Sequence, residues 1–140
     1  MKGAKMSNYA PTISQLITET DKTGEKLAKY YEPLKEAIDK DKDLSDIDLK
    51  ATREHFQNGT TFYKETLRKL KTLGVPARVL GKHKLLVGAY SDYADACQEM
   101  VDSINVDGHT VDKGVFKDSE EAQSDSVARV VKYTQKILIG

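Results

Sequence analysis

Three side chains that can perform chemistry recur at intervals of seven residues, namely His83, Tyr90 and Cys97. Histidine binds metals and transfers protons, and a cysteine thiolate is a nucleophile. Residues seven apart share one face of a helix, but each residue rises about 1.5 Å, so the row is about 21 Å long. The three side chains cannot converge on one metal or substrate. We therefore expect them to lie along the buried seam of a helix.

The rest of the chain offers no partner motif for these residues. His55 and His109 are the other histidines, and Glu-x-x-His, His-x-x-x-His and Cys-x-x-Cys are all absent. There is also no Gly-x-Ser-x-Gly elbow, P-loop or dinucleotide fingerprint. The sequence therefore predicts no catalytic residue, no metal site and no cofactor, and it favours a protein that is not an enzyme.

One loop has part of a calcium-binding pattern. Residues 103–114 place Asp107 and Gly108 where an EF-hand has a ligand and its required glycine, but the twelfth position is Gly114 instead of glutamate. The Asp107-Gly108 pair instead predicts a tight turn, with a small hairpin between Val106 and Val111.

The composition is that of a single helical domain. The chain has 140 residues, 22 basic and 22 acidic side chains, three prolines and no tryptophan. The single Cys97 excludes an internal disulfide, and a lone thiol favours the cytoplasm. If a signal peptide has been removed, the protein is instead exported. No apolar run approaches the length of a membrane span. Residues 70–104 resemble helical domains of bacterial proteins, which favours a bacterial source.

Apolar residues recur in steps of three and four along four segments, each beginning near a capping pair or a proline. The pattern predicts helices at 12–40, 46–73, 76–104 and 118–138. A kink is expected near Pro33, because proline removes one backbone donor. The segments predict an all-α, up-down-up-down four-helix bundle comprising residues 12–140, preceded by a flexible segment at 1–11. An intertwined homodimer fits the same pattern.

Glycines occur near the midpoints of three of these helices, at Gly24, Gly59 and Gly88. Each costs about 1 kcal/mol relative to alanine in a helix. Close approach of the helix backbones would explain them, and so would a small ligand bound at a glycine-lined waist.

Charge is unevenly distributed although the net charge is zero. Between residues 64 and 84 only Glu65 is acidic, whereas seven side chains are basic: Lys64, Arg68, Lys69, Lys71, Arg78, Lys82 and Lys84. In the predicted topology these residues lie at one end of the bundle, and aspartates gather at the other. Such a basic end is a candidate anion-binding surface.

Three functions stay open. The first is a non-catalytic interaction or structural module with an unidentified protein partner. The second is a binder of anionic surfaces (lipid head groups, cell-wall polymer or nucleic acid) through the basic end. The third is a carrier of a small apolar ligand at the waist formed by Gly24, Gly59 and Gly88.

Overall fold

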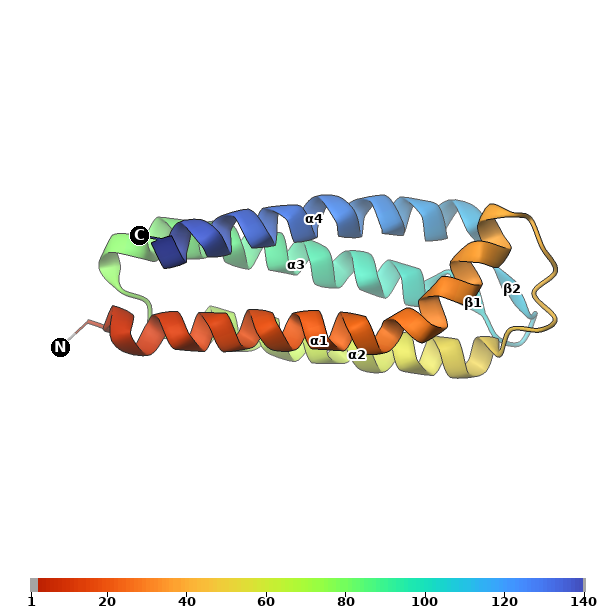
Figure 1. The fold of residues 1–140 in the computed structure, drawn as a ribbon, viewed down its shortest axis with the longest axis horizontal. Coiled ribbons are helices and arrows are strands. Elements are labelled where there is room, and N and C mark those ends of the chain that lie inside the picture. Colours follow the sequence, from red (N-terminus) through yellow and green to blue (C-terminus); the bar gives the residue numbers. More distant parts are fainter. Residues whose placement is uncertain (1–2, 140) are drawn as a thin grey trace.

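The computed structural model describes residues 3–139 and contains four long helices that run alternately up and down (Figure 1). Both ends of the chain therefore lie at the same end of the bundle, as the sequence predicted. The elements, in order, are α1 (Met6–Asp39), α2 (Leu49–Thr72), the 3₁₀ turn η1 (Ala77–Val79), α3 (Leu80–Asp102), β1 (Ile104–Asn105), β2 (Thr110–Val111) and α4 (Lys113–Ile139). The prediction of an all-α four-helix bundle is confirmed.

The first helix begins earlier than the sequence predicted. It starts at Met6 and continues through Pro11, so the predicted flexible segment is wrong for residues 6–11; residues 1 and 2 lie outside the described part. A proline in a helix costs about 3 kcal/mol, because one hydrogen bond is lost and the ring crowds the preceding turn. Packing offsets this cost: Tyr9 is only 2% exposed and its hydroxyl bonds to His83.

Two aspartates set the starts of later helices at positions that differ from the prediction. The Asp48 carboxylate accepts a hydrogen bond from the Ala51 amide at 2.9 Å, so α2 starts at Leu49 and not at residue 46. Asp112 accepts from the amide of Val115 at 3.0 Å, and α4 therefore begins five residues before the predicted start at 118. An aspartate in this position satisfies an amide that the first helical turn leaves unpaired.

A two-stranded hairpin closes the end of the bundle opposite the chain termini. Ile104 pairs with Val111 and Asn105 with Thr110, so the predicted hairpin is present with its strand starting before Val106. The Asn105 side chain accepts from the Gly108 amide at 2.9 Å. This side-chain oxygen is thus part of the turn.

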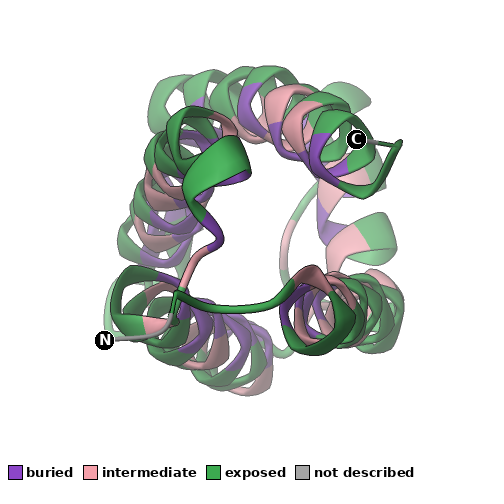
Figure 2. Cartoon of the chain, turned by 90° about the vertical axis from the view of Figure 1, so that its left-hand side faces the viewer, coloured by how far each residue is buried: buried purple, intermediate pink, exposed green. Residues whose placement is uncertain are grey.

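The helices do not approach one another equally. Small residues bring α3 and α4 close together, and Ser119 Oγ donates to the carbonyl of Ala96 at 2.8 Å. Contact between α1 and α4 is much sparser. The stretches of ribbon coloured as buried lie on the inward faces of the four helices (Figure 2). They form two separate clusters, one around Tyr90 towards the chain termini and one around Phe116 towards the hairpin.

The first helix bends near Pro33, and its last turns lean towards α4 (Figure 1). Pro33 has no N–H to donate to the carbonyl of Lys29, which accounts for the predicted kink. On the two sides of Pro33, the Tyr31 hydroxyl donates to Glu120, and Lys35 forms an ion pair with the same carboxylate at 3.2 Å. The bend thus leads α1 from its place beside α2 to a contact with α4.

Candidate functional site

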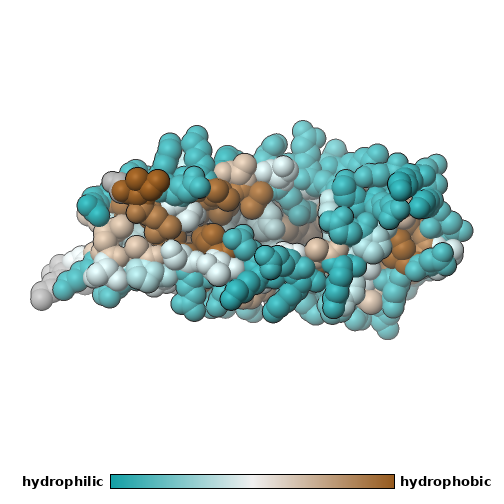
Figure 3. Space-filling view, in the orientation of Figure 1, coloured by the Kyte–Doolittle hydropathy of each residue, from teal (hydrophilic) through white to brown (hydrophobic). Residues whose placement is uncertain are grey.

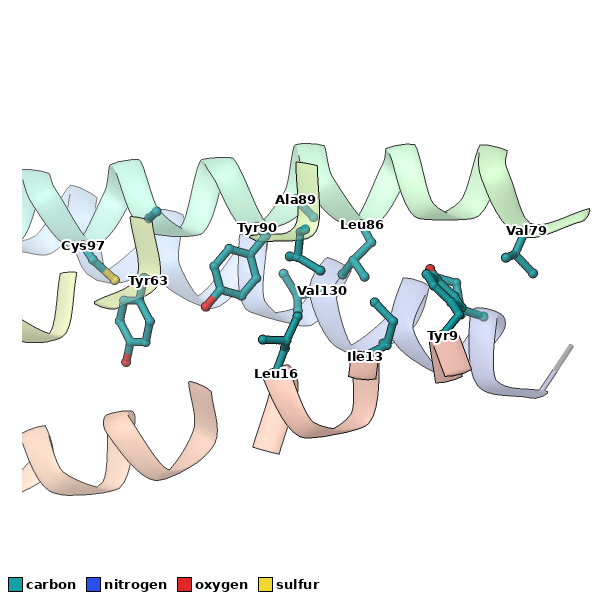
Figure 4. Packing of buried hydrophobic residues seen from close by; sticks show 13 residues of the cluster. Tyr9, Ile13, Leu16, Tyr63, Val79, Leu86, Ala89, Tyr90, Cys97 and Val130 are labelled. Atoms are coloured by element: carbon teal, nitrogen blue, oxygen red, sulfur yellow. The ribbon is translucent and has the colours of Figure 1, made fainter. Parts of the chain in front are cut away.

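The three side chains of the seven-residue row are all buried, and each has separate surroundings. Figure 4 shows Tyr90 and Cys97 projecting from α3 into the interior of the bundle. The Tyr90 hydroxyl lies 2.8 Å from Thr20 Oγ1. Because Thr20 already donates to the carbonyl of Leu16, Tyr90 is the donor in this pair. The row is a packing seam, as the spacing predicted.

His83 is a buried histidine whose two ring nitrogens both have partners. Its Nε2 lies 2.8 Å from the carbonyl oxygen of Leu70, and its Nδ1 lies 2.7 Å from the Tyr9 hydroxyl. A carbonyl only accepts, so Nε2 carries the hydrogen and Nδ1 accepts from tyrosine. The imidazole joins α1, α2 and α3 near the terminal end of the bundle. Sequence reasoning missed Tyr9, because Pro11 seemed to end the helix.

A cavity of about 290 Å³ lies in the middle of the bundle, beside the bend in α1 and between the two core clusters. All four helices contribute to its wall, and it is partly open to solvent. Its lining residues are Gly24, Leu27, Ala28, Tyr31, Glu32, Phe56, Thr60, Tyr63, Tyr93, Cys97, Met100 and Gln123. The wall is therefore mainly aromatic and aliphatic, with a few polar groups.

Only one of the three mid-helix glycines lines this cavity. A Cβ at Gly24 would meet only the Tyr63 hydroxyl oxygen, at 3.8 Å, so the missing side chain leaves space. Gly59 instead makes room for Leu27, whose Cδ1 would lie 2.6 Å from an added Cβ. Gly88 is exposed and has no such neighbour within 4 Å. Of the three glycines expected to line a ligand-binding waist, Gly24 alone therefore lines the cavity.

Low polarity dominates the cavity wall. Burial raises the pKa of the Tyr63 hydroxyl and of the Cys97 thiol to about 12, and it also raises the pKa of Tyr93. The rings of Tyr63 and Tyr93 lie 5.1 Å apart between their centres. All three groups are therefore uncharged at neutral pH, and the Cys97 thiol is a poor nucleophile. The wall suits an uncharged, flat molecule.

A carboxylate and an amide line the cavity from α1 and α4. On α1, Ala28 and Glu32 are one turn apart, and Gln123 faces them from α4. Glu32 is exposed, whereas Gln123 is half-buried and donates to Ser119 Oγ at 3.0 Å. An exposed carboxylate and a half-buried amide thus belong to the wall of a mainly aromatic and aliphatic cavity.

The α1–α4 seam stays partly open towards the chain termini. Glu120, Val131 and Leu138 share one face of α4, because they are eleven and seven residues apart. Glu120 contacts α1, so this face is directed at α1, yet Val131 and Leu138 are 45% and 41% exposed. Figure 3 shows hydrophobic side chains between these two helices in that half of the molecule.

The seven basic residues of the candidate anion-binding surface lie on the terminal half of α2, on η1 and on the start of α3, which is the end of the bundle expected from the topology. Lys64 lies farthest from the end of the bundle and donates to the Gln98 side chain at 2.7 Å. The other six have no carboxylate within 4 Å in the described part of the chain: Arg68, Lys69, Lys71, Arg78, Lys82 and Lys84.

The opposite end carries both signs of charge. Lys40 and Lys42 pair with Glu36 at 3.0 and 3.3 Å, and Lys113 pairs with Asp41. Lysines therefore offset part of the predicted acidic charge there. The two ends differ in that, within residues 3–139, the six basic residues Arg68, Lys69, Lys71, Arg78, Lys82 and Lys84 form no such pair.

The described residues contain no cluster of three or more histidine, cysteine or acidic side chains that could hold a metal ion. His109 in the hairpin turn is 2.9 Å from the carbonyl oxygen of Leu44, so its ring fastens the hairpin to the α1–α2 connection.

Within residues 3–139, no helix has the length and apolar character needed to cross a membrane. Comparison with models of known families, with curated proteins and with solved structures found no match.

Proposed function

We propose that the bundle binds a small, mainly apolar ligand in its central cavity, which is the third function that the sequence left open. The observation that carries the proposal is the cavity itself, about 290 Å³ and lined by all four helices. Ligand pockets are commonly about 300–1,000 Å³, and apolar cavities of about 150 Å³ already hold benzene. The volume is therefore that of a site for a small ring system or a short chain.

The lining indicates the chemistry of the ligand. Phe56, Tyr63 and Tyr93 offer ring faces and edges, and aromatic groups pack favourably against them. Glu32 and Gln123 also line the cavity, where they favour one hydrogen-bond donor and disfavour a carboxylate. The proposed ligand is flat and mostly apolar, with one donor group and no negative charge.

The other expectations stay predictions beside this proposal. A non-catalytic interaction module is compatible with a ligand-binding bundle, because one bundle can bind both a small ligand and a protein partner. A protein partner, an intertwined homodimer, a cytoplasmic location and a bacterial source are likewise predictions from the sequence.

Titration calorimetry with indole tests the proposal, because indole is flat, uncharged and carries one N–H donor. For nine non-hydrogen atoms, a dissociation constant on the order of 100 µM is expected. Ala28→Leu adds a larger side chain to the cavity wall and should weaken binding at least tenfold. Ala128→Leu is the matched control, because Ala128 lies mid-helix on α4 and is exposed. Indole-3-carboxylate should bind more weakly than indole because of Glu32.

Two results would overturn the proposal. One is the absence of saturable indole binding to the folded wild-type chain. The other is unchanged binding by Ala28→Leu while circular dichroism shows the same helicity as the wild type. If Ala28→Leu does not fold, Gly24→Leu replaces it, since a side chain at Gly24 enters the same space.

A further inference from the structure

Exposed apolar side chains gather at the end of the bundle that carries the chain termini. On α3, Leu80 and Leu85 are 42% and 53% exposed, and on α4, Leu138 and Ile139 are 41% and 88% exposed. Figure 3 shows hydrophobic atoms over the end of α4 at the left of the view. Single exposed leucines are ordinary, but a group at one end of an elongated molecule indicates an interaction surface.

The same end is strongly basic. The segments nearest to it, residues 3–18, 66–91 and 126–139, contain ten lysines and arginines and no aspartate or glutamate, and the acidic residues Glu19, Glu65, Asp92 and Asp125 directly adjoin them. Within residues 3–139, Arg129 alone among these ten has a carboxylate within 4 Å, namely Asp92 at 2.9 Å. The other nine cations are Lys5, Arg68, Lys69, Lys71, Arg78, Lys82, Lys84, Lys132 and Lys136.

A shallow hollow at this end combines both properties. It has a volume of about 380 Å³, and its apolar lining residues are Leu73, Val75, Leu80 and Val87. Lys71 and Lys84 also line the hollow and are exposed, so their ammonium groups reach solvent beside the apolar lining. The hollow thus presents an apolar surface and cationic groups to the same partner.

We propose that this basic, apolar end docks on the surface of an anionic lipid bilayer. Lysines within a Debye length attract acidic head groups, and exposed leucine and isoleucine side chains enter the region just below them. Charge complementarity also sets the orientation. The bundle stands with its terminal end on the membrane, because the aspartates of the opposite end are repelled by it.

Two features favour a lipid surface over nucleic acid. Exposed leucines among the lysines gain nothing from a phosphate backbone, whereas they gain apolar contact in a bilayer. Aromatic side chains on which bases stack are also lacking among the exposed residues of these segments, since Tyr9 and Tyr90 are buried and Tyr133 is half-buried. The surface therefore fits a partner that is anionic and apolar at once.

Co-sedimentation with large unilamellar vesicles tests the proposal in low salt. We expect the full chain to pellet with vesicles that contain 30% phosphatidylglycerol and to remain in solution with phosphatidylcholine alone. Charge reversal by Lys71→Glu with Lys84→Glu should lower partitioning about 25-fold or more, because each cation near an anionic surface contributes about fivefold. Lys50→Glu with Lys117→Glu is the matched control, since both lysines are exposed and lie towards the opposite end.

The apolar part of the surface needs its own variant. Leu85→Ser with Ile139→Ser should lower partitioning about tenfold, whereas Val115→Ser at the opposite end should leave it unchanged. Helicity and melting temperature confirm that each variant is folded. Equal binding to both vesicle types, or no binding to either, would overturn the proposal. So would charge-dependent binding to vesicles and to duplex DNA that the apolar variant leaves unchanged, because that pattern identifies a general polyanion site.

Discussion

Replacing the three mid-helix glycines by alanine, one at a time, separates free space in the bundle from close packing. Glycine in a helix costs about 1 kcal/mol relative to alanine, so each replacement begins with the same gain. At Gly88 an added Cβ has no neighbour within 4 Å, and the full gain should appear. At Gly24 the nearest atom is the Tyr63 hydroxyl oxygen, at 3.8 Å, which is an ordinary contact. Gly24→Ala should therefore stabilise the protein as much as Gly88→Ala.

Gly59→Ala should behave differently. The added Cβ would lie 2.6 Å from Leu27 Cδ1 and 3.4 Å from Leu27 Cγ, so the leucine must move. Overpacking of this kind costs about 1–3 kcal/mol, which cancels or exceeds the helix gain. The expected result lies between no change and a loss of about 2 kcal/mol. The lower cost applies if Leu27 turns into the cavity that it lines.

Thermal unfolding followed by circular dichroism at 222 nm measures these differences. For 140 residues, 1 kcal/mol corresponds to a shift of about 3 °C in the midpoint. We expect Gly88→Ala and Gly24→Ala to raise the midpoint by about 3 °C and Gly59→Ala to leave it unchanged or lower it. A destabilised Gly24→Ala would show that no space exists there. Equal stabilisation by all three would refute the assignment of Gly59 to the Leu27 contact.

Three further predictions follow from the buried polar groups. Tyr9→Phe leaves His83 Nδ1 without its hydrogen bond and should lower the free energy of unfolding by about 1–3 kcal/mol in a urea titration; no change would show that the pair is not formed. Burial raises the pKa of Tyr63 and Tyr90 to about 12 in the folded state, from about 10 in the unfolded chain. The folded state therefore holds these protons more tightly, so stability is fully present below pH 10 and is lost as the pH rises through 12. Tyrosinate absorbance at 295 nm should accordingly rise together with the loss of helicity, and ionisation without unfolding would contradict this. The Cys97 thiolate fraction at pH 8 should be about a thousandfold smaller than that of an exposed cysteine, since its pKa is about 12. Its reaction with a thiol reagent should be correspondingly slow until urea unfolds the chain, and a fast reaction in the folded state would contradict the burial.

The helical periodicity predicted the bundle because the steps of three and four depend only on which side chains leave water. The boundaries were less accurate, since they depend on single hydrogen bonds. Asp112 caps α4 earlier than the sequence predicted, and Tyr9 offsets the cost of Pro11 in α1. Local sequence rules assign Pro11 to a helix start, and only the partner His83, 74 residues away, shows why the helix continues.

The cavity could be predicted only in part. A glycine near the middle of α1 suggested missing volume, and Gly24 does line the cavity. The same reasoning was wrong for Gly88, which faces solvent, because glycine frequency does not report which face a residue occupies. A void depends on how far helices stand apart, and here it lies beside the bend at Pro33, where α3 and α4 are in close contact and α1 and α4 in sparse contact. No local sequence pattern predicts the distance between two helices. The basic end, in contrast, follows directly from charge order and topology.

The most direct test of the central claim is to locate bound indole by nuclear Overhauser effects from its protons to methionine methyl groups. Met100 lines the cavity, whereas Met6 lies in the first turn of α1 at the terminal end of the bundle. Selective ¹³C labelling of methionine methyl groups resolves the two. The proposed site predicts effects between indole and the Met100 methyl group, with none to Met6. Effects to Met6 alone, or the absence of any effect at saturating indole, would contradict the claim that the cavity holds the ligand.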